Sequence, residues 1–91
     1  MGLEIVELVM DCEEEFGISI SDKAAGVVGT VGEFHDLVFE LTRTSGKSEL
    51  RGRPDLEKYT WDRVRQLCVR PRKDFQFIKR STRFHEDLGF G

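Results

Sequence analysis

The sequence predicts a single all-α domain, built as a small four-helix bundle. Its 91 residues fit one domain, because domains usually run from about 50 to 250 residues. Apolar residues recur at helical spacing in three segments, and a fourth, shorter segment has only a weak helical pattern. With 38% hydrophobic and 34% charged residues, the chain can form a small core under a highly charged surface.

The first helix is expected over residues 3–16, followed by Gly17, which is suited to end a helix in the left-handed conformation. Its apolar face has the spacing i, i+4, i+7, i+11: Ile5, Val9, Cys12 and Phe16. Its opposite face carries five carboxylates within about 100° of one another on the helical wheel. They are Glu4, Glu7, Asp11, Glu14 and Glu15. Glu13 alone lies toward the apolar side.

A short second helix and a longer third helix are expected next. Ser21 or Asp22 can cap one weak turn, which the following glycines destabilise. Thr30 and Glu33 then have the spacing of a capping box, in which each side chain satisfies a backbone amide at the helix start. The helix is expected to run to about Thr42. Its apolar stripe is Phe34, Leu37, Val38 and Leu41.

A polar, glycine-containing run over residues 44–53 predicts a flexible linker before the fourth helix. Pro54 is suited to the first helical position, and Pro71 should stop the helix. Its buried face would comprise Leu56, Thr60, Val64, Leu67 and Cys68, together with Trp61. The tail has no sustained period, so we expect an irregular segment held by apolar anchors. They are Phe75, Phe77 or Ile78, Phe84 and Leu88.

Charge is distributed unevenly along the chain, although the net charge is −3. Residues 1–40 hold ten acidic side chains and one lysine, which gives −9. Residues 41–91 hold thirteen basic and seven acidic side chains, which gives +6. Asymmetry of this size is typical of a charged partner surface, although folding could also bring the two halves together and let them neutralise each other.

Two blocks of the sequence point to a known family. Residues 3–41 read LEIVELVMDCEEEFGISISDKAAGVVGTVGEFHDLVFEL, and residues 81–89 read STRFHEDLG. The first block resembles the second half of a bacterial acyl carrier protein, which comprises the recognition helix, a short third helix and the final helix. The match is closest in VELVM, EEEFGI and TVGEF. The second resembles the loop that precedes the recognition helix in that family. Residues 61–69 stand in place of the family's first helix, so the resemblance covers residues 3–42 and 59–90.

The resemblance implies a circular permutation. In ordinary members the first helix and loop precede the recognition helix, whereas here the recognition-helix block comes first and the loop block last. We therefore expect one acyl-carrier-like domain over residues 1–91 with circularly permuted helix order. Residues 3–42 match the family's second half, residues 43–58 form the linker, and residues 59–91 match the first helix and loop. A truncated reading frame in a tandem array would give the same order.

The resemblance also implies that the attachment serine is missing. Ordinary members carry phosphopantetheine on the serine of an Asp-Ser-Leu motif, and Gly2 falls at the serine position with Leu3 at the leucine. Since glycine has no side chain to take the arm, no phosphopantetheine attachment and no cofactor are expected.

In this family the acidic helix docks onto basic patches of partner enzymes. The resemblance therefore implies a docking module, not an enzyme, which binds a partner from acyl or polyketide metabolism without a covalent arm. The acids named above would bind that partner. One alternative is a genuine acyl carrier with an unrecognised attachment site. Another is a structural oligomer in which chains exchange helices, although a monomer is favoured.

Other classes of site are disfavoured. Cys12, Cys68, His35 and His85 match no zinc spacing, so no metal site is expected and the cysteines should be reduced core thiols. His85 lies beside Glu86 and Asp87, but no nearby nucleophile makes it a general base. Nucleic acid could contact the basic half, with Phe75 and Phe77 stacking on bases, but the acidic surface would repel phosphates. The basic side chains concerned are Arg63, Arg65, Arg70, Arg72, Lys73, Lys79, Arg80 and Arg83.

A membrane location is also disfavoured. No apolar run approaches the roughly 20 residues that a bilayer crossing needs. The first residues carry acids where a signal peptide would carry basic residues, so we expect a cytoplasmic protein.

Overall fold

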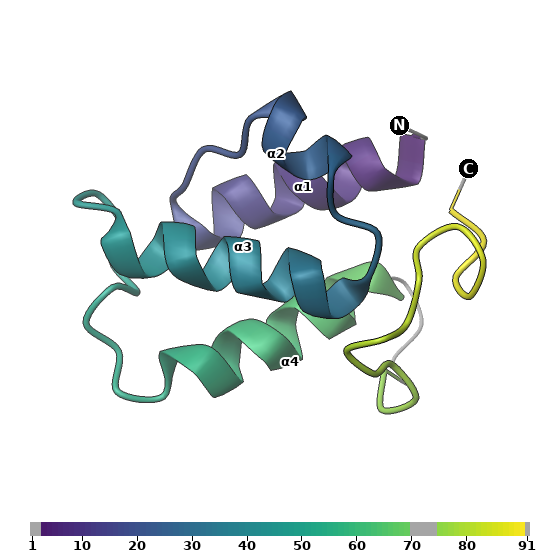
Figure 1. The fold of residues 1–91 in the computed structure, drawn as a ribbon. Coiled ribbons are helices and arrows are strands. Elements are labelled where there is room, and N and C mark those ends of the chain that lie inside the picture. Colours follow the sequence, from purple (N-terminus) through teal and green to yellow (C-terminus); the bar gives the residue numbers. More distant parts are fainter. Residues whose placement is uncertain (1–2, 70–74, 91) are drawn as a thin grey trace.

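The computed structural model describes residues 3–69 and 75–90, and this part of the chain is a bundle of helices with an irregular tail. The helices are α1 (Leu3–Phe16), α2 (Asp22–Gly26), α3 (Val31–Thr44) and α4 (Leu56–Cys68). Figure 1 shows α1, α3 and α4 packed together, with α2 beside α1 and the tail around one end of the bundle. The described residues contain no β-strand beyond one isolated bridge between Thr30 and Arg83. The predicted all-α bundle is confirmed.

The predicted boundaries of the first and third helices agree well with the structure. α1 has the expected bounds, and Gly17 follows it with a φ of 65°. At the start of α3 the Thr30 hydroxyl accepts a 3.1 Å hydrogen bond from the Glu33 amide, and Glu33 Oε1 accepts one of 3.0 Å from the Thr30 amide. The capping box is therefore present. α3 continues to Thr44, two residues beyond the expected end.

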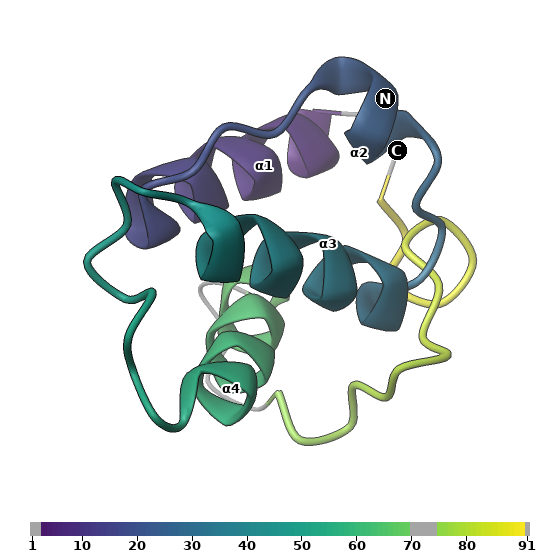
Figure 2. The same cartoon turned by 60° about the vertical axis from the view of Figure 1, so that its left-hand side comes forward.

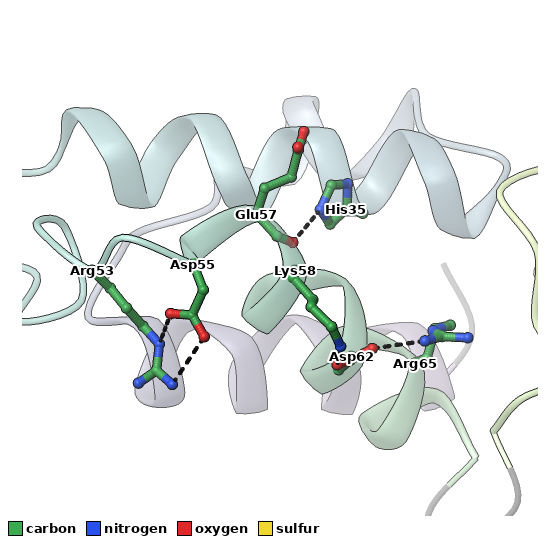
Figure 3. Close-up of polar contacts among 7 residues, drawn as sticks. All are labelled: His35, Arg53, Asp55, Glu57, Lys58, Asp62 and Arg65. Carbon is green, nitrogen blue, oxygen red and sulfur yellow. Dashed lines mark hydrogen bonds and ion pairs between the residues drawn. The ribbon is translucent and has the colours of Figure 1, made fainter.

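The fourth helix begins later than predicted. Pro54 is expected at its first position, but Pro54 and Asp55 lie in a turn and α4 starts at Leu56. The prediction is wrong because the Leu56 amide donates to the Arg53 carbonyl and closes that turn. Asp55, the residue before the helix, makes no capping bond and instead pairs with the Arg53 guanidinium (Figure 3). The helix ends at Cys68, before Pro71, as expected.

The core takes side chains from every helix and from the tail. Its fully buried members include Phe16 of α1, Phe34 of α3, Val64 of α4 and Phe84 of the tail. Both cysteines are free and buried, as predicted. Between the two alternative tail anchors, Ile78 is the buried one at 2% exposure, whereas Phe77 is 45% exposed.

The tail docks onto the start of α3 through backbone hydrogen bonds. The Val31 amide donates to the Thr82 carbonyl at 2.8 Å, and the Gly32 amide donates to the Arg80 carbonyl at 3.0 Å. Both amides belong to the first turn of a helix and have no partner within it. Gly32 is required here because a Cβ at this position would lie 2.8 Å from the Arg80 carbonyl oxygen. The tail thus supplies acceptors for two amides at the start of α3.

The predicted linker contacts the C-terminal end of α1. The Ser48 hydroxyl donates a 2.6 Å hydrogen bond to the Phe16 carbonyl, one of the last carbonyls of α1. The same hydroxyl oxygen accepts from the Leu50 amide at 3.3 Å, and the Leu50 side chain packs against the core. Part of the segment expected as a linker therefore covers the C-terminal end of α1.

Candidate functional site

The acidic face of α1 is the candidate site that the sequence predicts. Three of its five acids are exposed: Glu4, Glu7 and Glu14. The other two, Asp11 and Glu15, are half-buried. The five acids therefore differ in exposure along α1.

Glu15 is held by α4. The Tyr59 hydroxyl donates a 2.6 Å hydrogen bond to Glu15 Oε2, and Arg63 donates to both carboxylate oxygens at 3.2 Å. The hydrogen bond from Tyr59, followed by those from Arg63, lowers the pKa of the Glu15 carboxyl below its ordinary value. The sequence predicts Glu15 as a partner-binding residue, and its contacts give it the further role of joining two helices.

Glu13, which departs from the acidic face, has a structural contact of its own. Its Oε2 accepts a 2.7 Å hydrogen bond from the Ile20 amide, in the connector between α1 and α2. The side chain is half-buried, which agrees with its position toward the apolar side of the helical wheel. It holds the connector against α1.

α1 also exposes two apolar side chains that the helical period places on the flank of the core face. Met10 is 61% exposed and Val6 is 38% exposed, whereas Leu8 is 3% exposed. Val6, Met10 and Glu14 are spaced i, i+4, i+8, so they form one row on the helix surface. That spacing is the signal in the sequence that could have found them. The row places apolar surface beside the exposed carboxylates.

The end of the tail lies beside the start of α1. Figures 1 and 2 show the two ends side by side in both views. Phe90 of the tail and three acids of α1 line one cavity of about 110 Å³. Its lining residues are Glu4, Glu7, Leu8, Asp11, Leu67, Cys68 and Phe90. Gly2, the residue at the expected serine position, lies outside the described residues.

Many basic side chains of the second half pair with acids of this same chain. Among the described residues, two long-range pairs join the acidic and basic halves, Arg63 with Glu15 at 3.2 Å and Arg80 with Asp36 at 2.6 Å. The local pair Arg43–Glu40 also crosses the boundary between the halves. The other local pairs lie within the basic half: Arg53–Asp55, Lys58–Asp62, Arg65–Asp62, Arg83–Glu86 and Arg83–Asp87. Figure 3 shows Asp62 between Lys58 and Arg65 on α4. Folding thus pairs part of the negative charge of residues 1–40 with basic side chains of residues 41–91.

The two phenylalanines considered for nucleic-acid stacking differ in exposure. Phe75 lies under the Arg65 guanidinium, whose carbon is 5.0 Å from the ring centre, and Phe77 is partly exposed. Arg70, Arg72 and Lys73 lie outside the described residues.

The cysteines and histidines are not brought together as one cluster. Within residues 3–69 and 75–90, no group of three or more His, Cys, Asp or Glu side chains could hold a metal ion. Burial raises the pKa of the Cys12 thiol, and it raises the pKa of Cys68 to about 12. His35 is buried between aromatic rings, whereas His85 is exposed with Nδ1 2.8 Å from the Phe90 carbonyl oxygen.

Half of the chain is similar to plant acyl carrier proteins. Acyl carrier protein 4, chloroplastic, and acyl carrier protein 1, chloroplastic, both of Cuphea lanceolata, are each 43% identical to it over 45 residues. The match covers 50% of this chain and 32% of each relative, so the chain spans about a third of the length of these curated relatives. This partial homology indicates an acyl-carrier-like protein. No protein-family model matches, and no solved structure matches with statistical significance.

No helix in the described part of the chain has the length and apolar character that a membrane crossing requires. The cytoplasmic location remains a prediction.

Proposed function

We propose that this chain is an acyl-carrier-like docking module that binds a protein partner through the acidic face of α1, without a covalent phosphopantetheine arm. The partner is an enzyme of acyl or polyketide metabolism with a basic patch. The observation that carries the proposal is the row formed by Val6, Met10 and Glu14 on the surface of α1, beside which Glu7 is also exposed.

The chemistry of this face fits a basic partner. Exposed carboxylates attract a basic patch over a distance of about one Debye length and orient the approaching protein. Met10 supplies a flexible apolar side chain that can enter a shallow pocket once the two surfaces meet. Glu15 is the exception, because its carboxylate already accepts three hydrogen bonds from α4. We therefore assign docking chiefly to Glu4, Glu7 and Glu14.

The circular permutation is part of the same proposal. A permuted chain needs ends that lie close together where the ordinary chain is continuous. The tail ends beside the start of α1, and Phe90 shares a cavity with Glu4 and Glu7. The tail block also packs on the start of α3 and α4 packs on α3, so blocks from opposite ends of the sequence form one core. These contacts support a permuted carrier fold.

The position of Gly2 supports the part of the proposal that concerns the missing arm. It stands where the resemblance implies the serine that carries phosphopantetheine, and glycine offers no hydroxyl. A genuine carrier that uses another attachment site is the alternative, and the similarity to acyl carrier proteins favours it over the helix-exchanged oligomer.

Charge reversal on α1 tests the docking proposal. Glu7→Lys with Glu14→Lys should abolish binding to the responsive members of a panel of purified acyl-carrier-dependent enzymes. Binding to the unmodified chain should weaken between about 50 mM and about 300 mM salt, because exposed charges are screened. The matched control is Glu40→Lys with Glu86→Lys, which changes the net charge equally on other exposed surfaces. Binding that survives the α1 reversals, or a panel without any binder, would contradict the proposal.

A further inference from the structure

Met10 is the one exposed sulfur-bearing side chain within residues 3–69 and 75–90. It lies on α1 and is 61% exposed. The other two sulfur atoms in this part of the chain belong to Cys12 and Cys68, which are 0% and 7% exposed. Solvent therefore reaches the thioether of Met10 and hardly reaches either thiol.

The helical period explains why two neighbouring sulfur atoms differ so much. Met10 and Cys12 are two residues apart on α1, which turns the helix by about 200°. Cys12 is buried in the core with Val9 and Phe16, whereas Met10 is left in solvent. A chemical change at Met10 therefore alters the surface of α1 without entering the core.

The environment of the thiols directs an oxidant to Met10. A cysteine reacts with peroxides chiefly as the thiolate. Burial raises the pKa of the Cys12 thiol and raises the pKa of Cys68 to about 12, so almost no thiolate exists at neutral pH. A thioether has no proton to lose, so its oxidation requires only access. The usual preference of a peroxide for cysteine is thus reversed in this chain.

Met10 stands in the middle of the exposed row on α1. Val6 precedes it by four residues and Glu14 follows it by four, so both are its neighbours on the helix surface. Glu7, three residues before it, is also exposed. Met10 is the larger and the more exposed of the two apolar side chains in the row. Its chemical state therefore decides how apolar the row is.

We propose that Met10 is an oxidation site through which a peroxide controls docking by the acidic face of α1. In this step the O–O bond of hydrogen peroxide breaks and one oxygen atom is transferred to Sδ. The thioether loses two electrons and becomes a sulfoxide, and the peroxide is reduced to water. A sulfoxide is polar, so the side chain no longer gains free energy by entering an apolar pocket of the partner.

The effect on binding rests on the proposed docking function, whereas the selective oxidation of Met10 does not. The modification is also reversible, because methionine sulfoxide reductases restore the thioether, one enzyme for each sulfoxide epimer. With dithiothreitol as the reductant, the sulfoxide oxygen leaves as water and dithiothreitol becomes a cyclic disulfide.

Peptide mapping by mass spectrometry after brief treatment with hydrogen peroxide tests the selectivity. In the native chain Met10 should gain one oxygen atom at a rate close to that of a short unstructured methionine peptide. Cys12 and Cys68 should stay reduced until guanidinium chloride exposes them. Oxidation of either cysteine before Met10 in the native chain, or a Met10 that resists the peroxide, would overturn the proposal.

Binding to the enzyme panel tests the effect on docking. The treated chain should bind the responsive enzymes about tenfold more weakly, because the burial of one methionine side chain is lost. Met10→Leu stays apolar and should bind equally well before and after treatment; it retains Met1 and so controls for oxidation there. Met10→Gln, which is polar, should bind weakly without peroxide. Unchanged binding by the treated chain, or a loss of binding in treated Met10→Leu, would contradict the proposal.

Two further measurements separate loss of docking from damage to the fold. The urea midpoint of the treated chain should not change, because Met10 is outside the core, and a lower midpoint would count against control at the surface. The two reductases with dithiothreitol should restore binding. A panel without any binder for the untreated chain would contradict the docking function and, with it, the control of docking. The peptide map would still decide whether Met10 is the oxidised sulfur.

Discussion

The Tyr59 hydroxyl lies 2.6 Å from Glu15 Oε2 and donates a hydrogen bond that joins α4 to α1 across 44 residues of sequence. Arg63, one turn further along α4, donates to the same carboxylate. The contact lowers the pKa of Glu15 and raises that of Tyr59. It joins a helix of the acidic half of the chain to a helix of the basic half, and it gives one acid of the candidate docking face a structural role.

Removing the hydroxyl should destabilise the bundle. Tyr59→Phe keeps the ring, which makes a T-shaped contact with Phe16 with the centres 6.0 Å apart, and deletes only the hydrogen bond to Glu15. We expect the free energy of unfolding to fall by about 1 kcal/mol, since the contact is only partly buried. Urea unfolding followed by circular dichroism measures this value. An unchanged midpoint would show that the hydrogen bond contributes nothing.

The same contact makes stability depend on pH. The pKa of Glu15 is depressed in the folded chain, so its contribution is present above the ordinary value of 4.5 and is lost as pH falls further. Glu15→Gln should therefore be less stable than the unmodified chain near pH 7, and the difference should shrink toward about pH 3. Paired urea titrations across this range measure it. A difference that stays constant with pH would contradict the assignment.

Gly32 should tolerate no larger side chain. In Gly32→Ala the new Cβ would meet Arg80 at 2.8 Å, which forces the tail away from α3. Overpacking of this kind costs about 1–3 kcal/mol. Gly26→Ala is the matched control, because nothing lies within 4 Å of that position and alanine favours the helix. We expect thermal unfolding to show a lower midpoint for the first variant and an equal or higher midpoint for the second. Equal losses in both would refute the steric conflict with Arg80.

The two thiols should be inert in the folded chain. Burial raises the pKa of both Cys12 and Cys68, so almost no thiolate exists at about pH 8. A thiol reagent such as Ellman's should label neither residue in native buffer and both in concentrated guanidinium chloride. Rapid labelling of the native chain would mean that the core around α1 and α4 opens readily.

The main helices can be predicted because their signals are local. The apolar spacing of α1 and the Thr30–Glu33 capping box depend only on residues within a few turns. Other features depend on which neighbour covers a residue. Periodicity places Met10 on the flank of the core face, but no described element covers that edge, so it is exposed. Likewise the helical wheel groups Glu15 with the exposed acids, and only the position of α4 brings Tyr59 and Arg63 to it.

The tail shows the same limit. Its apolar residues have no period, so the choice between Phe77 and Ile78 cannot be made from spacing. The selection of Ile78 depends on how the tail packs against the start of α3. The sequence considers His35 only as part of a disfavoured metal site, because its contacts with Glu57 of α4 and Arg80 of the tail depend on distant segments. Contacts between distant segments cannot be predicted from the local spacing of residues in a single sequence.

Intact-mass measurement after incubation with a phosphopantetheinyl transferase and coenzyme A tests the central claim most directly. An ordinary acyl carrier protein in the same reaction should gain the mass of one phosphopantetheine group. The 91-residue chain should keep its original mass, because Gly2 has no hydroxyl at the position of the attachment serine. The addition of one phosphopantetheine to this chain would contradict the armless docking module and identify the chain as a genuine carrier.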